Sequence, residues 1–341
     1  MFVFTYTQSE ELVQKEHAMI LLSVIIEYFS QSDIDTYYES LNPIIENYLQ
    51  SEQPSLKRLA VETVYNLTSM GSTSSSSVIK KYPNLIPLVL NAINMDDEDL
   101  IKKIFETLME FIYIKKVMRQ HLDVMINAAL TVAQNTELAN HVREVAITFV
   151  EELGEFFARP LAKKNPQLVM QIVQAGFKIS CEEKEDINEE EWEDQPCDFA
   201  LHLLFKYAEE CPNDFVYPLF KENLVQCWQH ASPQIRMAGL KILGFVSDPD
   251  CLLDPIKDDI DELTDVLVAC LKDADKHVRN QAGYTVGEFA QNVVPEFLDE
   301  HEKVLPCLLS VITEQVKAIS AGNKQAGDNM DKSLHALTEF C

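Results

Sequence analysis

Apolar residues along this chain recur three and four positions apart, the spacing of a helix with one buried side. The clearest example runs from about residue 256 to 272, with an apolar stripe made of Ile260, Leu263, Val266, Leu267 and Cys270. A polar turn at 273–276 leads to a second stretch, 277–292, whose stripe consists of Val278, Ala282, Val286 and Phe289. Pro295 follows and stops this second helix. The pattern predicts a pair of helices, A and B, joined by a tight turn.

The start of helix B carries a short phrase that recurs along the chain: an apolar residue, usually Lys or Arg, two spacers and often Ala. Its basic positions are Lys15, Lys57, Lys102, Arg143, Arg236 and Arg279. The successive intervals are 42, 45, 41, 93 and 43 residues, so the fourth interval contains one hidden copy. A period of roughly 40–47 residues is typical of HEAT and armadillo arrays of helix pairs. Such arrays bind long surfaces rather than enclose a catalytic pocket.

The repeat predicts an all-α fold, namely a right-handed HEAT-repeat α-solenoid (superhelix) of about seven to eight helix pairs that forms one array over 1–341. The expected units are 1–31 (partial), 32–73, 74–116, 117–162, 163–212, 213–248, 249–296 and 297–341 (incomplete). The expected helices are 11–29, 41–49, 54–70, 85–93, 99–114, 122–132, 139–157, 168–177, 215–228, 233–246, 256–272, 277–292, 304–318 and 333–341. Terminal repeats normally carry a polar outer face. Neither end does so here, and we expect a piece of a longer array.

The hidden copy contains an insertion. Aligning its apolar stripe puts Ala200 in the place of Ala282 and Cys197 in the place of Arg279, which divides the long interval into 54 and 39 residues. The extra residues form an acidic loop, 182–195, between helices A and B. Its nine carboxylates and one Trp are Glu182, Glu183, Glu185, Asp186, Glu189, Glu190, Glu191, Trp192, Glu193 and Asp194. A block of like charge repels itself, and we expect a mobile loop.

Two interpretations of this loop stay open. It can be a solvated connection with no partner, with Trp192 packed against its own helix. Alternatively it binds a basic surface, with Trp192 as the anchor and the carboxylates steering the partner, because a large aromatic side chain is costly to leave in water and is common at interfaces. A second insertion, 321–329, predicts only a flexible connection.

Composition narrows the classes of partner. The net charge of −27 disfavours nucleic acid and anionic membranes and favours basic proteins, although acidity can also serve solubility alone. No run approaches the ~20 apolar residues of a membrane span. The eight Cys residues form no Cys-x-x-Cys pair, so we expect free thiols, no metal, no cofactor and a cytosolic or nuclear location. We expect no enzyme, because the chain has no phosphate-binding Gly-rich loop, His-Glu-x-x-His or Gly-x-Ser-x-Gly motif.

Two sets of side chains are candidates for specific roles. Steps of 100° per residue from Ala282 predict which positions of the B helices face away from the buried stripe. These candidate contacts are Glu62, Asn66, Glu110, Glu144, Glu151, Asn280, Tyr284 and Glu288. They could grip the Lys side chains and backbone of an extended basic peptide, or form only a solvated face. At the turns between helices we expect a structural ladder that links neighbouring units, made of Asp273, Arg279, Arg236 and Arg143.

Helix pairs interrupted by an acidic, Trp-containing loop resemble the importin-beta (karyopherin) family. The stretches that carry the resemblance are 191–194, 235–240, 271–273, 278–282 and 286–287, which are similar to the loop and two following repeats of the importin-four and importin-five branch. Upstream, 85–87, 121–123 and 142–144 fall in matching order. The Asp–Arg ladder fits this resemblance, because HEAT arrays commonly link neighbouring units by such hydrogen bonds.

The resemblance implies a nuclear import receptor that shuttles between cytoplasm and nucleus as a monomer. Such receptors bind basic cargo (histones, ribosomal proteins or similar) on the concave inner helices and release it when Ran-GTP binds, with the acidic loop taking part. They also contact phenylalanine-glycine nucleoporins. The resemblance further implies an N-terminal-half fragment that lacks the first repeats, which hold the principal Ran site. The alternatives are a HEAT scaffold such as a phosphatase regulatory subunit, whose units are shorter and lack the acidic loop, and a chaperone of basic nuclear proteins.

Overall fold

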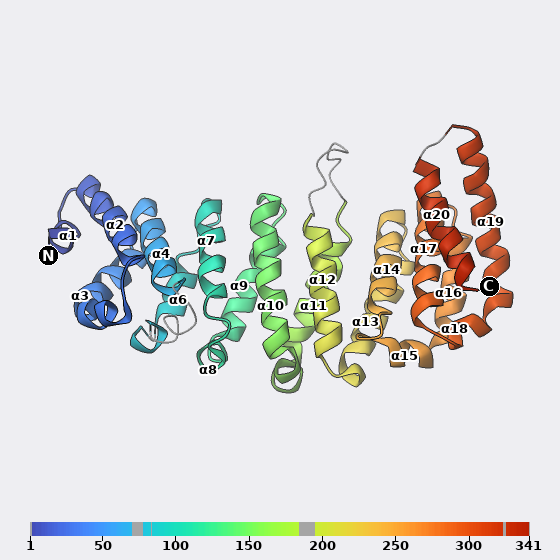
Figure 1. Ribbon diagram of the computed structural model, residues 1–341, viewed down its shortest axis with the longest axis horizontal. Coiled ribbons are helices and arrows are strands. Elements are labelled where there is room, and N and C mark those ends of the chain that lie inside the picture. The colour runs from blue at the N-terminus through green and yellow to red at the C-terminus, as the bar shows by residue number, and fades with distance from the viewer. Residues whose placement is uncertain (1, 70–77, 83, 184–194, 323–324, 341) are drawn as a thin grey trace. The chain divides into compact units, whose positions relative to one another are not determined.

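The computed structural model describes residues 2–69, 78–82, 84–183, 195–322 and 325–340, and Figure 1 shows their arrangement. The secondary structure in these ranges is helical, without a strand. The chain forms two compact units, 1–156 and 157–341, and helix α10 (Asn140–Lys164) contributes residues to both. The all-α class and the stacked helix pairs of a solenoid, both predicted from the sequence, are confirmed.

The first unit contains helix pairs that bury apolar stripes against one another. Its helices are α1 (Phe2–Tyr6), α2 (Leu12–Ile26), α3 (Gln31–Leu49), α4 (Pro54–Thr68), α6 (Leu85–Asn91), α7 (Glu98–Met109), α8 (Lys115–Met118), α9 (Leu122–Ala133) and the first part of α10. The second helices α2, α4 and α7 pack side by side, and α3 and α6 cover them from one side. Between α7 and α10, the fully buried rings of Phe105 and Phe149 lie 5.5 Å apart.

The second unit repeats this plan. Its helices are α11 (Pro166–Ser180), α12 (Pro196–Glu210), α13 (Asn213–Trp228), α14 (Pro233–Val246), α15 (Leu253–Asp258), α16 (Ile260–Leu271), α17 (Lys276–Asn292), α18 (Glu296–Asp299), α19 (His301–Ser320) and α20 (Gln325–Glu339). Helices α14, α17 and α20 lie side by side, each packed on its own partner helix (Figure 1). Gly239 permits the close crossing of α13 and α14, because a Cβ at this position would lie 2.6 Å from Cys227 Cβ.

Several helix boundaries differ from the sequence-based expectation. Helix α3 begins at Gln31 rather than 41, because Ser30 caps it: Asp33 N donates to Ser30 Oγ (3.3 Å) and Ser30 N donates to Asp33 Oδ2 (2.8 Å). Helix α10 runs on to Lys164 rather than ending at 157, since Leu161 continues its buried stripe. Helix α20 begins at Gln325, so the flexible connection expected at 321–329 is largely helical.

Another difference lies at Asp259, where the single helix expected over 256–272 divides into α15 and α16. The Asp259 carboxylate accepts hydrogen bonds from Tyr217 Oη (2.7 Å) and Lys221 Nζ (2.9 Å), both on α13. These two bonds lower the pKa of Asp259 against the opposing effect of burial. The interruption places a charged residue at a junction between helices, a feature that hydrophobic periodicity does not reveal.

Candidate functional site

The carboxylates predicted as contacts on the B helices of the first unit fall on half-buried positions. Glu62 lies on α4, Glu110 caps the C-terminal end of α7, and Glu144 and Glu151 lie on α10. Burial raises the pKa of the Glu110 carboxyl, so this side chain holds its charge less readily than an exposed glutamate does. Glu144 and Glu151 both have interaction partners. Each of these carboxylates is therefore reachable from solvent, but only in part.

Asn66 is the exception, and its prediction as a surface contact was wrong. Its side chain is only 7% exposed, and its amide nitrogen donates to the Ser23 carbonyl (3.1 Å) and to Glu27 Oε1 (3.2 Å) on α2. The amide thus links α4 to α2 inside the first unit. Helix geometry placed Asn66 away from its own stripe, but the neighbouring B helix covers that side.

In the second unit, α17 presents the remaining three candidates. Tyr284 is 37% exposed, and burial, followed by the Glu288 carboxylate, raises the pKa of its phenol. Glu288 is half-buried beside it. Asn280 instead accepts a hydrogen bond from Gln315 Nε2 (3.0 Å) on α19, so it also takes part in packing between helices. Tyr284 and Glu288 are therefore the more accessible pair.

A row of aromatic side chains on α12 and α14 was not found from the sequence. Phe245 on α14 is 38% exposed and meets two rings of α12 edge-on: His202 at 5.5 Å and Phe205 at 5.3 Å between ring centroids. Lys241, one turn before Phe245, donates to Asp198 Oδ1 on α12 (3.1 Å). We call Asp198, His202, Lys241, Phe245, Tyr284 and Glu288 the second-helix face of this unit. This face combines apolar area with charge of both signs.

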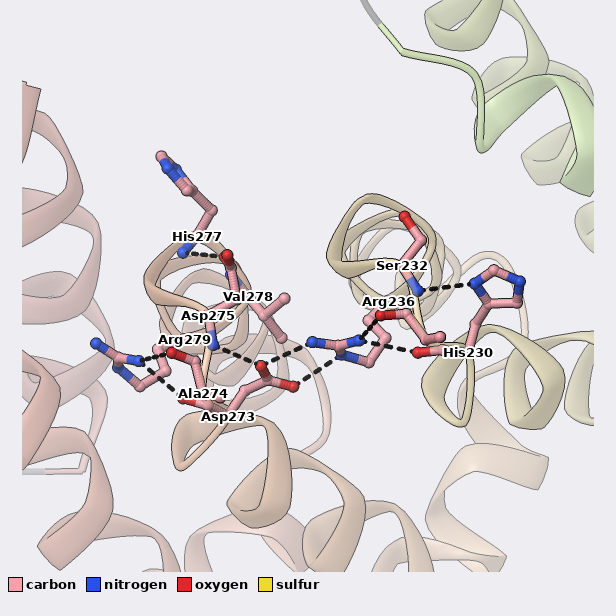
Figure 2. A network of polar contacts seen from close by, with 10 residues as sticks. His230, Ser232, Arg236, Asp273, Ala274, Asp275, His277, Val278 and Arg279 are labelled. Atoms are coloured by element: carbon pink, nitrogen blue, oxygen red, sulfur yellow. Dashed lines mark hydrogen bonds and ion pairs between the residues drawn. The ribbon is translucent and has the colours of Figure 1, made fainter.

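The turns between the paired helices carry a polar network, drawn in Figure 2. Arg236 donates from Nε to Asp273 Oδ2 (2.8 Å) and from Nη2 to Asp273 Oδ1 (2.9 Å), so a fork of two bonds joins α14 to the turn before α17. Its Nη1 donates to the carbonyls of His230 (2.8 Å) and Ala231 (2.9 Å). These bonds raise the pKa of Arg236 and, against burial, lower that of Asp273. Arg236 thus fixes its own turn and the next one.

Arg279 makes the corresponding bonds, to two turn carbonyls and a carboxylate, at the next turn along the chain. It donates to the carbonyls of Asp273 (2.7 Å) and Ala274 (3.1 Å) and, from Nη2, to Glu314 Oε2 on α19 (2.8 Å). Arg143 is 4% exposed and donates from Nε to the Ala133 carbonyl (2.9 Å). The first unit has an equivalent bond from Arg58 Nη2 to Asp97 Oδ1 (2.7 Å). The repeated phrase had assigned the basic position there to Lys57, one residue too early.

The acidic loop lies mostly outside the described residues. Glu185, Asp186, Glu189, Glu190, Glu191, Trp192, Glu193 and Asp194 belong to that segment. Of the predicted loop residues, Glu182 and Glu183 are described and follow the end of α11, and the Glu182 carbonyl accepts from Gln234 Nε2 on α14 (3.3 Å). On the other side, Gln195 N donates to Asp198 Oδ2 (3.2 Å) at the start of α12. Both flanks of the loop are therefore held in the second unit.

The same described residues also bear on metal binding, membrane insertion and thiol chemistry. Across the described ranges, no group of three or more His, Cys, Asp or Glu side chains could hold a metal ion. None of the described helices has the length and apolarity of a membrane span. The seven described cysteines are free thiols, and all except Cys181 are buried.

Comparison with known proteins gives a consistent picture. A family model described as "IPO5-like, TPR repeats" matches residues 1–128. Importin-4 of Homo sapiens is 24% identical over 321 residues, which cover 88% of this chain and 29% of Importin-4. The chain is similar to proteins of the importin-beta family over most of its length. A probable importin subunit beta-4 of Schizosaccharomyces pombe is 22% identical over 261 residues, covering 75% of this chain and 23% of the relative.

The fold of this chain is also that of a solved karyopherin. The crystal structure of Kap121p matches with a TM-score of 0.77 at 17% identity, over 99% of this chain and 33% of Kap121p. The chain spans about a third of the length of these relatives. These similarities agree with the resemblance found in the sequence.

Proposed function

We propose that this chain is part of a nuclear transport receptor that carries basic cargo through nuclear pores and releases it under the control of Ran-GTP. The observation that carries the proposal is the similarity to Importin-4 over 88% of the chain. Kap121p, which shares the fold, has been crystallised with RanGTP, with Nup53p and with Pho4p. By analogy, the partners proposed here are Ran-GTP, phenylalanine-glycine nucleoporins and basic proteins such as histones or ribosomal proteins.

The charge of the chain supports basic cargo. With a net charge of −27, the surface attracts cationic proteins over distances of about a Debye length, ~8 Å at physiological salt. Half-buried carboxylates such as Glu62 and Glu288 suit the amino groups of Lys side chains, because partial burial strengthens a charge-assisted hydrogen bond. Exposed rings such as Phe245 and Tyr284 add apolar contact beside them. We propose that cargo binds at such positions on the second helices within each unit.

The acidic loop is proposed to take part in the exchange of cargo for Ran-GTP. Its nine carboxylates lie within a short stretch of sequence, and the flanks that the structure describes join α11 to α12 and, through Gln234, to α14. The described flanks therefore lie at the start of α12 and beside α14, two of the helices that form the second-helix face.

A chaperone of basic nuclear proteins is the second candidate, because the same negative charge would shield histones or ribosomal proteins. The two functions differ in the effect of Ran-GTP. A receptor gives up its cargo when Ran-GTP binds, whereas a chaperone without this regulation does not. Neither function requires catalysis, and we propose none for this chain, nor any stable self-association. As a receptor it would pass repeatedly between cytoplasm and nucleus.

The test is a binding assay with the 341-residue chain immobilised. Histone H3–H4 or a basic ribosomal protein is bound first, and Ran loaded with GTP or GDP is then added. The proposal predicts cargo release by the GTP form and not by the GDP form. Binding of cargo without nucleotide-dependent release would favour the chaperone, and loss of all cargo binding would remove both candidates.

The role of the loop is tested separately. Replacing its nine carboxylates by the corresponding amides removes negative charge while keeping side-chain size. The proposal predicts weaker binding of basic proteins and a smaller dependence of affinity on salt. A control variant carries amides at an equal number of exposed carboxylates in the first unit. If the loop variant and the control bind basic proteins with the same affinity and salt dependence, the loop is a solvated connection without a binding role.

A further inference from the structure

An aromatic pair in the first unit is occupied by a cation of the chain itself. The rings of Tyr113 and Phe156 meet edge to face, with centroids 5.6 Å apart and planes at 69°. Tyr113 lies after the end of α7 and is 67% exposed, while Phe156 lies on α10 and is half-buried. Lys115, at the start of α8, places its Nζ 4.5 Å from the centroid of Phe156. One face of the ring thus already receives a positive charge.

This arrangement differs from another lysine–ring contact of the same unit. Lys103 lies over Tyr65 with its Nζ 3.5 Å from the ring centroid, and it also pairs with Glu106 at 3.3 Å. Its side chain is only 28% exposed, so it is fixed between α4 and α7. Lys115 is exposed, and among the described residues it forms no ion pair. Among the described residues, the Phe156 ring is therefore the group that holds the Lys115 ammonium.

Such a contact is weak enough to be exchanged. A cation over an aromatic face at an exposed site gains only a modest free energy, and a second cation can replace the first at little cost. Glu110, three residues before Tyr113, is half-buried, and burial raises the pKa of its carboxyl. A carboxylate whose charge is disfavoured by burial gains most from an incoming cation. The Phe156 ring can therefore exchange Lys115 for another positive side chain.

We propose that Tyr113 and Phe156 form a binding site for a Lys or Arg side chain of a basic partner, and that Lys115 occupies this site as an internal competitor in the free chain. The inference rests on the proposed function, since it takes the partner to be basic. An incoming side chain would displace Lys115 from the Phe156 ring into solvent. The site thereby favours partners that present a cation strongly enough to replace the one already there.

The chain offers a matched control for this proposal in Lys116. Both lysines are exposed and adjacent, so Lys115→Ala and Lys116→Ala remove the same charge from almost the same place. General electrostatic attraction therefore changes equally in both variants. Only Lys115→Ala removes the cation from the Phe156 ring. We expect Lys115→Ala to bind a fluorescent deca-lysine peptide roughly two- to fivefold more tightly than Lys116→Ala, measured by fluorescence anisotropy at fixed ionic strength.

A second variant guards against an indirect effect. Phe156→Leu, introduced into the Lys115→Ala background, should remove the gain while circular dichroism shows an unchanged helix content. Equal affinities of Lys115→Ala and Lys116→Ala, with the wild-type chain still binding the peptide, would overturn the site but leave the proposed function intact. A wild-type chain that fails to bind deca-lysine would overturn both proposals.

Discussion

The ion pair of Arg236 and Asp273 gives the sharpest prediction about the stability of the array. Arg236→Met keeps the aliphatic stem of the side chain and removes four hydrogen bonds: two to the Asp273 carboxylate and one each to the carbonyls of His230 and Ala231. The two charged side chains are only 15% and 14% exposed. The substitution therefore leaves a largely buried carboxylate without its cationic partner.

The expected cost follows from this degree of burial. Breaking a fully buried ion pair costs about 3–5 kcal/mol, whereas an exposed pair contributes about 0–1 kcal/mol. At the observed exposure we expect Arg236→Met to lower the free energy of unfolding by about 2–4 kcal/mol. Arg279→Met is the matched control, since Arg279 also holds two turn carbonyls but pairs with Glu314, which is 51% exposed. The control should lose about 1–2 kcal/mol.

Urea unfolding followed by circular dichroism measures both losses, and amide hydrogen exchange shows whether they are confined to α14 and α17. A double-mutant cycle with Asp273→Asn isolates the pair itself, with a coupling energy of about 1–3 kcal/mol expected. The asparagine can still accept the Asp275 backbone N–H, which lies 2.8 Å from Asp273 Oδ1. A loss below about 0.5 kcal/mol, or one no larger than that of Arg279→Met, would refute the reasoning.

Two further predictions concern the second unit. Gly239→Ala should destabilise the chain by about 1–3 kcal/mol, because its Cβ would lie 2.6 Å from Cys227 Cβ. Gly244→Ala on the same helix, where the nearest atoms lie at 3.5 Å, should be neutral or stabilising by up to about 1 kcal/mol; urea unfolding that ranks the two variants in the opposite order would contradict this. The stability that Arg236 confers should be constant near neutral pH and fall progressively below about pH 4, because burial raises the pKa of Asp273 but the bonds from Arg236 lower it on balance. A free-energy difference between wild type and Arg236→Met that is the same at pH 3 and pH 7 would exclude this link.

Local sequence signals were sufficient where the structure depends on neighbouring residues. The three- and four-residue spacing located both helices of the clearest pair, since a helix buries one stripe whatever lies against it. The turn before α17 was recognisable from its polar residues, and the ladder expected at the turns included both Arg236 and Asp273, which form a bond. The capping box of Ser30 and Asp33 was available in the sequence too but was overlooked, which set the start of α3 ten residues late.

Positions that depend on how one helix meets the next could not be predicted in this way. The repeated phrase selected Lys57, whereas Arg58 reaches Asp97, because a change of one residue turns a side chain by 100° and the neighbouring turn decides which one is used. The contacts of Phe245 with α12 likewise join residues about 40 positions apart. No pattern within one helix indicates them.

The sequence by itself determined the all-α class, the period of the helix pairs, the acidic insertion and the family to which the chain is related. These features follow from spacing and composition, which are properties of the chain alone. Only the tertiary structure decided which polar side chains remain accessible. Asn66 and Tyr284 both lie off the buried stripes of their own helices, yet Asn66 is covered by α2 and Tyr284 is exposed. The difference arises because accessibility depends on the packing of neighbouring helices, and that packing depends on contacts between residues far apart in the chain.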